Sequence, residues 1–529
     1  MPEAPPTAAA NRGFSRRRLV QAGTVTAATA AVTATAGVSP ASAAVTYTPV
    51  RYTATPVPTA ATRHIANRFS YGYTPTLGAQ IVRAGGPDKW FEAQLNPAAI
   101  ADASVDGFDT WWFSINADAP TLWRRDQNKI EGGWQAMANY ARWSLVRRMY
   151  SNRHVLEVMT EFWENHLHVP AIGSPWMTHR SAYGKMIRSH ALGRFDEMLF
   201  EAITHPAMGI YLDNAKSTAK APNENLGREL LELHTLGVGN YTESDVKNSA
   251  RIITGWAVDM FNTWDAYYNE DWHVTGRVTV GSFTDANTSP DGRDVSRRYL
   301  SYLAHHPDTA RRIARKLAIR FVSDTPSQAL VDHLARVYLD NDTAIKPVLR
   351  ALVATAEFQG SAGQKVRTST EDIIATYRAL GVKVAKPTSA KAAANAMLYQ
   401  TTDLGLAPFA WARPDGQPDH NEAWSSASRL LASFRIHYVM SGGWYPTQDA
   451  RYRKPVSWLP ARTIRFDQLV DHLSRTLLGQ NSSAALLKAC CQATGVSPRE
   501  KVTATHAIAR YKMPRLLSTI LDTPAFMTR

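Results

Sequence analysis

The chain has 529 residues and a formal net charge of +14. This length exceeds what a single hydrophobic core usually holds, so we expect two lobes. The positive charge would suit acidic partners such as envelope polymers, but it is spread along the chain rather than gathered in runs, so a solvated basic surface is the simpler interpretation and nucleic acid is not expected as a partner. The two cysteines, Cys490 and Cys491, are adjacent, which excludes a disulfide framework and leaves a cysteine metal cluster unsupported.

The first 43 residues have the features of a twin-arginine export signal. Arg16 and Arg17 precede an apolar Ala/Thr-rich stretch that ends in a small-residue cleavage motif at Ala43. We predict a signal peptide over 1–43 and export of the folded protein to an extracellular or cell-envelope location; the alternative is a basic arm followed by a low-complexity linker. Loss of this segment, with its four arginines and one glutamate, would lower the net charge from +14 to +11. No later segment has the ~18 uncharged apolar residues that a membrane span needs, so we predict no transmembrane segment in the mature chain.

Helical periodicity dominates the rest of the chain and predicts a mainly α, multi-helical fold. A Pro/Thr-rich tether over 44–62 leads to a main helical lobe over 63–360 and a C-terminal helical lobe over 361–529, which a Pro/Gly/Asp-rich insert interrupts over 408–420. The stretch 264–285 alternates loosely and predicts a short hairpin. The spacing of apolar residues predicts helices over 78–95, 134–150, 154–168, 178–190, 194–204, 224–236, 243–254, 291–304, 307–321, 327–339, 343–357, 370–380, 423–440, 466–478 and 505–521.

His166 lies on the apolar face of the predicted helix 154–168. The simplest interpretation is a core histidine whose ring nitrogens are satisfied by the backbone or by a neighbouring side chain. Glu161, Glu164 and His168 lie on the opposite face, which we expect to be solvated. Glu164 and His168 are four residues apart and could form a metal clip, but on a charged face a solvated pair is the simpler interpretation.

Glu229 lies between leucines on the predicted helix 224–236 and is expected to be buried. A buried carboxylate is costly unless it is protonated, paired or bound to a metal. Candidate partners are Arg68, Arg251 and His166, and both a structural ion pair and a functional role remain open. Arg228 stands at four-residue spacing from two glutamates, as in an exposed ion-pair ladder.

Asp245 opens the predicted helix 243–254 in a capping-box-like sequence, so a capping role alone would explain it. Two glycines nevertheless predict a tight turn before this helix. That turn would bring Asp245 back towards the helix that carries Glu229.

Two loops carry candidate ligand-binding residues. Asn223 is explained as a helix cap, which leaves Asp213 and Asn214 free to bind a ligand or a hard cation. In the insert 408–420, prolines and a glycine explain the turn around Asp415, but its length and Trp411 leave room for a substrate-facing loop.

Several standard catalytic signatures are missing from the chain. It has no HExxH, GxSxG, Walker phosphate loop, GxGxxG after a strand, CxxC or EF-hand loop. These absences argue against a zincin, an α/β-hydrolase, a P-loop enzyme and a Rossmann oxidoreductase.

Several segments together resemble the bacterial domain-of-unknown-function family numbered 1800. They are 65–75 (IANRFSYGYTP), 162–166 (FWENH), 205–214 (HPAMGIYLDN), 222–237 (PNENLGRELLELHTLG), 241–246 (YTESDV), 253–256 (ITGW) and 414–416 (PDG). The match extends over nearly the whole mature chain in the family's order. The resemblance implies an exported protein, often using the twin-arginine route and often encoded beside exported sulfatase-like proteins. Its name implies no activity.

The family's motifs fall on ten candidate positions, which include His166 and Glu229, the two residues placed on apolar faces of their predicted helices. The ten positions are Asn165, His166, Asp213, Asn214, Asn223, Glu224, Arg228, Glu229, Glu232 and Asp245. The chain departs from the family in two places. Members commonly carry His at the position of Glu164, and His-Asp at the positions of His273 and Val274. A metal site that used those positions would be weakened here.

We predict a hydrolase that acts on an extracellular or envelope polymer, a glycan rather than a protein, because several tryptophans lie in loops where they can stack on sugar rings. Glu229 would be the acid, Asp245 the base or nucleophile, and His166 would orient or share a proton. In a metal-dependent version these three residues would hold one divalent ion that activates water. The expected substrate-binding residues are Asn165, Asp213, Asn214, Asn223, Arg228, Trp411 and Asp415. The competing hypothesis is a non-catalytic polymer-binding or assembly protein that works with an exported sulfatase-like partner.

Overall fold

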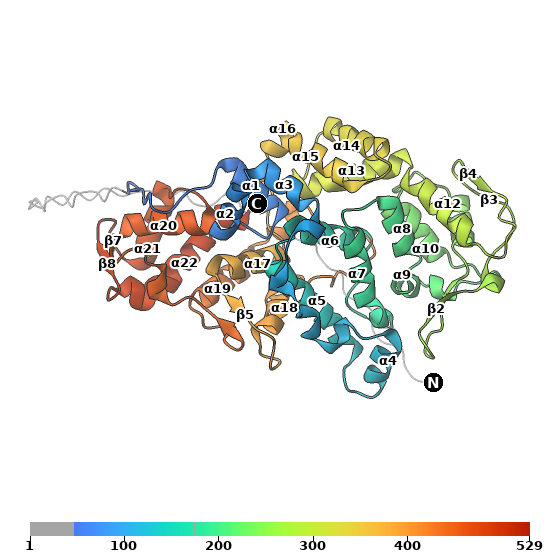
Figure 1. The fold of residues 1–529 in the computed structure, drawn as a ribbon, viewed down its shortest axis with the longest axis horizontal. Coiled ribbons are helices and arrows are strands. Elements are labelled where there is room, and N and C mark those ends of the chain that lie inside the picture. The colour runs from blue at the N-terminus through green and yellow to red at the C-terminus, as the bar shows by residue number, and fades with distance from the viewer. Residues whose placement is uncertain (1–46, 174) are drawn as a thin grey trace, which may run out of the picture. The chain divides into compact units, whose positions relative to one another are not determined.

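A computed structural model describes residues 47–173 and 175–529, and most of them are helical (Figure 1). This confirms the prediction of a mainly α fold. The predicted signal peptide over 1–43 lies outside the described residues and stays a prediction. In the part of the chain that is described, no helix combines the length and the apolar character that crossing a membrane requires.

The helices are connected by short turns and loops. The first are α1 (Ala60–Phe69), α2 (Pro75–Arg83), α3 (Pro87–Gln94), α4 (Ala119–Gln127), α5 (Gly133–Tyr150), α6 (His154–His166), α7 (Arg180–His190), α8 (Phe195–Ile203), α9 (Pro206–Tyr211), α10 (Glu224–Glu229) and α11 (Glu243–Ile252). They are followed by α12 (Arg293–Ala304), α13 (Pro307–Phe321), α14 (Gln328–Asp340), α15 (Ile345–Ala354), α16 (Ala356–Gln359), α17 (Ser369–Leu380), α18 (Ala393–Asp403), α19 (Ala427–Ser441), α20 (Phe466–Leu478), α21 (Ala484–Thr494), α22 (Met513–Leu521) and α23 (Pro524–Met527).

Strands occur among the described residues as four two-stranded antiparallel pairs. They are β1 (Trp256–Val258) with β2 (Ala266–Tyr268), β3 (Val278–Val280) with β4 (Phe283–Asp285), β5 (Lys383–Val384) with β6 (Ala450–Arg451), and β7 (Thr463–Arg465) with β8 (Lys501–Thr503). The hairpin predicted over 264–285 is β3–β4, whereas β2, in the same stretch, pairs with the preceding β1.

Local chemistry explains where several helices begin and end. The single helix predicted over 78–95 is two helices, because Gly85 and Gly86 adopt positive φ angles of 90° and 110° that interrupt the helical backbone. α17 begins with a capping box in which Thr368 and Glu371 satisfy each other's backbone N–H groups, and it ends at Gly381 in the left-handed conformation.

The helix predicted over 224–236 changes type within its length. α10 is an α-helix, and residues Leu230–His234 continue it as a π-helix, η7. Gly227 allows α10 to approach α11 closely, because a Cβ at this position would lie 2.8 Å from the backbone nitrogen of Ala250. Single π-helical turns inside helices are frequent at functional sites.

α6 is buried on all sides, contrary to the predicted solvated face. Glu164 is only 1% exposed and pairs with Arg180 at 3.0 Å. The other carboxylates of the helix are paired in the same way, Glu157 with Arg147 at 3.0 Å and Glu161 with Arg148 at 3.2 Å. The wheel placed these residues correctly on one face, but that face meets arginines of α5, α7 and α13 instead of water.

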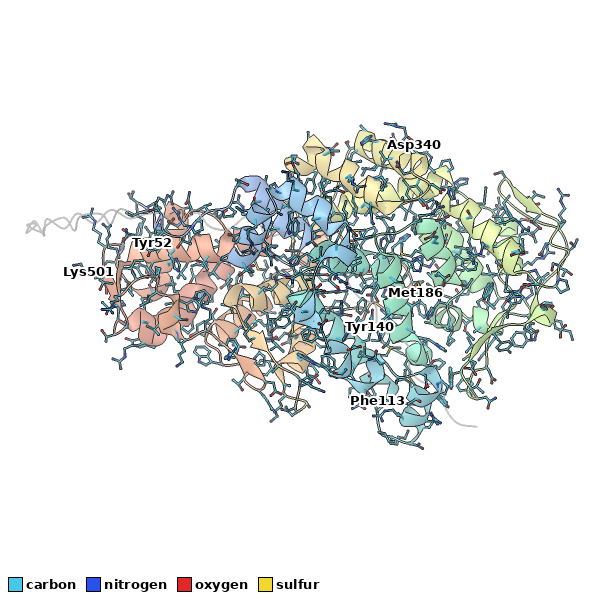
Figure 2. The ribbon with its side chains drawn as sticks, viewed as in Figure 1. Tyr52, Phe113, Tyr140, Met186, Asp340 and Lys501 are labelled. Atoms are coloured by element: carbon cyan, nitrogen blue, oxygen red, sulfur yellow. The ribbon has the colours of Figure 1, made fainter. Side chains whose placement is uncertain are left out.

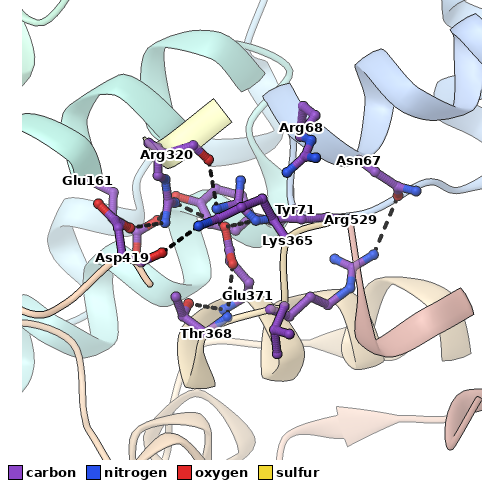
Figure 3. Close-up of polar contacts among 12 residues, drawn as sticks. Asn67, Arg68, Tyr71, Glu161, Arg320, Lys365, Thr368, Glu371, Asp419 and Arg529 are labelled. Carbon is purple, nitrogen blue, oxygen red and sulfur yellow. Dashed lines mark hydrogen bonds and ion pairs between the residues drawn. The ribbon is translucent and has the colours of Figure 1, made fainter. Parts of the chain in front are cut away.

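Arg320 of α13 is the centre of a buried ion-pair network (Figure 3). Its guanidinium lies 3.3 Å from Glu161, 3.0 Å from Glu371 and 3.0 Å from Asp419. Glu371 also pairs with Arg529 at 3.2 Å. Burial opposes the charge of Glu371, but the charges of Arg529 and Arg320 outweigh burial and lower its pKa to about 2. Because these carboxylates come from α6, α17 and the insert 408–420, the network fixes all three segments to α13.

Residues Tyr47–Arg529 form one compact unit. Part of the predicted tether belongs to it, because Arg51 pairs with Asp471 of α20 at 3.1 Å and the backbone N–H of Tyr52 donates to the same carboxylate at 2.8 Å. Figure 2 shows Tyr140 among the helices and Phe113 towards the edge of the unit, in agreement with exposures of 1% and 56%. The predicted boundary near residue 360 stays a prediction.

Candidate functional site

Three segments that are distant in sequence meet at the C-terminal end of α6. They are α6 itself, the α10–η7 helix and the insert 408–420. Asn165 of α6 binds the insert with both groups of its side-chain amide: Nδ2 donates to the carbonyl of Gln417 at 2.8 Å, and Oδ1 accepts from its N–H at 2.7 Å. Gly416 makes this contact possible, because a Cβ there would lie 2.0 Å from the carbonyl oxygen of Asn165. His168 also holds the insert through a 2.7 Å hydrogen bond from Nε2 to the carbonyl of Trp411.

His166 is buried beside this junction and forms a reciprocal pair with His234 of η7. His166 Nε2 donates to the His234 carbonyl at 3.1 Å, and His234 Nδ1 donates to the His166 carbonyl at 3.0 Å. His166 Nδ1 lies 3.1 Å from the ammonium group of Lys316 and therefore accepts from it. Burial and the charge of Lys316 hold the pKa of His166 well below its usual range, so the imidazole is neutral. This confirms the interpretation of His166 as a core histidine whose ring nitrogens are satisfied. It also shows that His166 contacts the amine of Lys316, a residue that the sequence analysis had not singled out.

Lys316 has an unusual environment for a lysine. It is partly buried on α13, and burial together with the charge of Arg312 lowers its pKa to about 8. Its amine therefore loses its proton much closer to neutral pH than that of an exposed lysine does.

Glu229 is half-buried, and the charges that act on it are those of two acids, Glu232 and Asp415, and the smaller opposing charge of Arg228. Among the described residues, none forms an ion pair or a hydrogen bond with its carboxyl group, so neither Arg68, Arg251 nor His166 is its partner. Burial and the negative charges of Glu232 and Asp415 raise its pKa. The predicted raised pKa of Glu229 is confirmed, and the carboxylates that contribute to it are those of Glu232 and Asp415, not that of Asp245.

Asp415 stands on the insert beside an aromatic ring. Its Oδ1 accepts a 2.7 Å hydrogen bond from Nε1 of Trp411, and its Oδ2 pairs with Arg413 at 3.1 Å. Tyr211 of α9 completes the group: its hydroxyl donates to the carbonyl of Ala412 at 2.9 Å, and burial and the charges of Glu229 and Asp415 raise its pKa to about 12. Trp411 also lines a cleft of about 340 Å³ that runs along the insert to Trp424.

Several predicted site residues have structural roles elsewhere. Asp245 caps α11 through Thr242, and its Oδ1 accepts from the N–H of Gly281 at 2.9 Å in the β3–β4 turn. Asn223 is the N-cap of α10. Arg228 pairs with Glu243 at 2.7 Å and with Glu224 at 3.6 Å on the surface, which confirms the exposed ladder in part. No contact links Asp245 to His166 or Glu229 among the residues that the structure describes.

Asp213 and Asn214 lie on a loop that passes beside a different cleft. Asp213 is exposed in the left-handed conformation, and Asn214 is buried with Nδ2 donating to the carbonyl of Ile253 at 3.0 Å. Asn214 lines a cleft of about 180 Å³ together with Trp256 and Tyr268. Among the described residues, neither side chain forms a hydrogen bond or an ion pair with Glu229, Asp415 or His166.

The metal-dependent version needs His166, Glu229 and Asp245 in one place. Within residues 47–173 and 175–529, no three His, Cys, Asp or Glu side chains are grouped so that they could hold a metal ion. The residues present therefore do not fit the predicted single-ion site.

The fold and the junction define a mainly α-helical protein with an ion-paired centre and a docked insert held against the C-terminal end of α6. The family model described as "Protein of unknown function (DUF1800)" matches residues 64–528, and the chain belongs to this family. No curated protein and no solved structure was found to match the chain. The resemblance seen in the sequence motifs is thus confirmed, and the chemistry must be argued from the site itself.

Proposed function

We propose that this protein is an exported hydrolase that cleaves glycosidic bonds in an extracellular or envelope polymer. The observation that supports the proposal is Glu229, a half-buried carboxyl group without a cationic partner among the described residues, whose pKa is raised by burial and by the nearby carboxylates of Glu232 and Asp415. Two carboxyl groups whose environments differ are the usual machinery of glycoside hydrolysis.

Each carboxyl group has a distinct role in this proposal. Glu229 in its acid form protonates the oxygen of the leaving sugar while the bond from that oxygen to the anomeric carbon breaks. Asp415, on the insert, accepts a proton from the water molecule that attacks the anomeric carbon. Trp411 supplies an aromatic face beside Asp415 on which a sugar ring can stack. The basic surface favours a polymer with acidic groups.

The test is the release of reducing sugar from a panel of acidic and neutral envelope polysaccharides. We expect Glu229→Gln and Asp415→Asn to lower kcat by about 100-fold or more with the fold retained, since general acid–base groups contribute roughly 10²–10⁴-fold. Glu224→Gln, on the exposed ladder of the same helix, is the matched control and should keep full activity. Wild-type release without loss in Glu229→Gln would refute the assignment of the acid.

The pH profile provides an independent check. Activity should fall as pH rises through the pKa of Glu229, because the acid form is needed. Glu232→Gln removes one of the charges that raise this pKa, so the alkaline limb should move to lower pH. An alkaline limb that stays in place in Glu232→Gln would contradict the role of Glu229.

A second candidate function is binding of a polymer without catalysis, in partnership with an exported sulfatase-like protein. The cleft beside Asn214 favours this candidate, because Trp256, Tyr267 and Tyr268 give it an aromatic wall. Affinity electrophoresis in polysaccharide gels would show retardation that Tyr267→Ala abolishes, together with no release of reducing sugar by the wild type.

A further inference from the structure

A pocket on another side of α6 carries positive charge without any acidic residue to balance it. It has a volume of about 270 Å³ and lies where α2, α5 and α17 meet β5 (elements labelled in Figure 1). The polar side chains that line it include Thr74, Thr76, Gln80, Asn152, Arg378 and Lys383. No aspartate or glutamate is among its lining residues.

Arg378 lines this pocket without a carboxylate partner among the described residues. In the described chain its side chain makes one hydrogen bond, from Nη2 to the carbonyl of Gly72 at 3.3 Å, and its buried Nε has no partner. It forms no ion pair with any described residue, and the neighbouring charge that acts most strongly on it is another cation, Arg367. By contrast, the buried Arg148 of α5, Arg180 of α7 and Arg320 of α13 each pair with a carboxylate of α6. An unpaired guanidinium at a pocket wall is a costly arrangement unless an anion completes it.

The other walls of the pocket present groups that suit an anion. Lys383 is exposed at the rim and has no ion-pair partner among the described residues. Thr74 caps the first turn of α2, so the positive end of that helix lies at the pocket, and Gln80 lines it one turn further along. His154 lines the inner wall, and burial and the charge of Arg378 keep it neutral by holding its pKa well below its usual range.

We propose that this pocket binds an oxyanion, namely a phosphate, sulfate or carboxylate group, with Arg378 as its anchor and Lys383 at its rim. A planar guanidinium with free donors can bind two oxygens of such a group at once. The oxyanion is either a free ion or a pendant group of an acidic glycan, and both have the same chemistry at Arg378. This site is separate from the proposed hydrolytic site, and its occupation does not require hydrolysis.

The test is isothermal titration of the Glu229→Gln protein, so that loss of hydrolysis cannot be confused with loss of binding. The probes are inorganic phosphate, a trisaccharide of galacturonic acid and a neutral glucose trisaccharide. We expect saturable binding of phosphate or of the acidic trisaccharide, weakened about tenfold or more by Arg378→Gln. Arg83→Gln, at the exposed far end of α2, is the matched control and should bind as tightly as the parent.

The outcomes separate the two sources of the oxyanion. Tighter binding of the acidic trisaccharide than of phosphate assigns the pocket to a glycan, and the reverse order assigns it to a free ion. Equal binding of the neutral trisaccharide, or unchanged affinity in Arg378→Gln, would overturn the proposal. If Arg378→Gln does not fold, as judged by near-ultraviolet circular dichroism, Lys383→Gln replaces it, because that exposed side chain can be changed without disturbing the core.

His154 provides a second readout within the pocket. An oxyanion at Arg378 would offset the positive charge that disfavours protonation of His154, so the pKa of this histidine should rise on binding. Ring resonances of His154, followed by NMR with and without phosphate, should titrate at higher pH in the bound form. An unchanged His154 at saturating ligand would place the ligand elsewhere.

Discussion

His437 offers the most direct test of the ion-paired interior, because its protonation is required by its neighbours. It is 1% exposed on α19, with Nδ1 2.7 Å from Asp522 and Nε2 3.0 Å from Asp372 of α17. Asp372 also pairs with Arg429 at 3.2 Å and accepts from Ser433. Burial alone would lower the pKa of His437, but the charge of Asp372 and the hydrogen bonds from the ring to both carboxylates raise it from 6.5 to about 9.

The sign and size of the effect follow from linkage. Because the folded-state pKa of His437 exceeds its unfolded value, its contribution is fully present below pH 6.5 and disappears as the pH rises through about 9. At about 1.4 kcal/mol for each unit of pKa, the contribution is about 3 kcal/mol. The pKa of Asp372 is lowered from 3.8 to about 2 by His437 and Arg429 against the effect of burial, so a second loss of stability begins as the pH falls below about 4 and is complete below about 2.

The assay is denaturant unfolding of the wild type and of His437→Gln at a series of pH values from about 6 to 10. Other groups titrate in both proteins, so the quantity to follow is the difference between their free energies of unfolding. We expect the wild type to lose about 3 kcal/mol more than the variant across this range. A difference that does not change with pH would refute the conclusion that His437 is charged in the folded protein.

Three further predictions concern the network, the insert and the cap. Arg320→Ala removes one of the two cations that each of the buried carboxylates of Glu161 and Glu371 contacts and should cost up to about 3–5 kcal/mol in denaturant unfolding, whereas Arg350→Ala, which breaks an exposed pair, should cost less than about 1 kcal/mol. Gly416→Ala places a Cβ against the carbonyl of Asn165 at a φ of 76°, so the insert should undock; faster proteolysis within 408–420 with an unchanged helical spectrum would show this, and unchanged proteolysis would contradict it. Asp245→Ala should lower stability by about 1 kcal/mol as a lost cap while activity is retained, and an inactive but stable variant would restore Asp245 to the catalytic group.

Helix positions could be predicted well wherever one face is apolar. The spacing over 307–321 and 466–478 gave the bounds of α13 and α20, because these helices have a clear apolar stripe. The wheel was misleading for α6, since periodicity separates polar from apolar faces but does not say whether arginines or water cover the polar one. The split between α2 and α3 could have been predicted from the consecutive glycines at 85 and 86.

Only some residues of the candidate site could be predicted from the sequence. Glu229 could be found because a carboxylate among leucines is visible on a wheel, but its neighbour Asp415 is 186 positions further along the chain. No local pattern links residues that far apart. Lys316 was missed because its helix carries several basic residues, and only the packing of α13 against α6 shows that this one meets His166. Tyr211 lies within a family motif but had no local feature to single it out.

The way Asn165 holds the insert has a consequence for how this site can change during evolution. Its amide bonds to the main-chain N–H and carbonyl of Gln417, so docking depends on the shape of the backbone and not on the identity of the side chain at 417. Side chains around it, such as those of Gln417 and Trp411, can therefore be exchanged without loss of the attachment, provided that Gly416 is kept. Relatives that share the asparagine and the Pro-Asp-Gly turn can therefore hold inserts of different sequence at the same attachment point. Exchange of the insert between two such relatives, with docking measured by proteolysis, would test this directly.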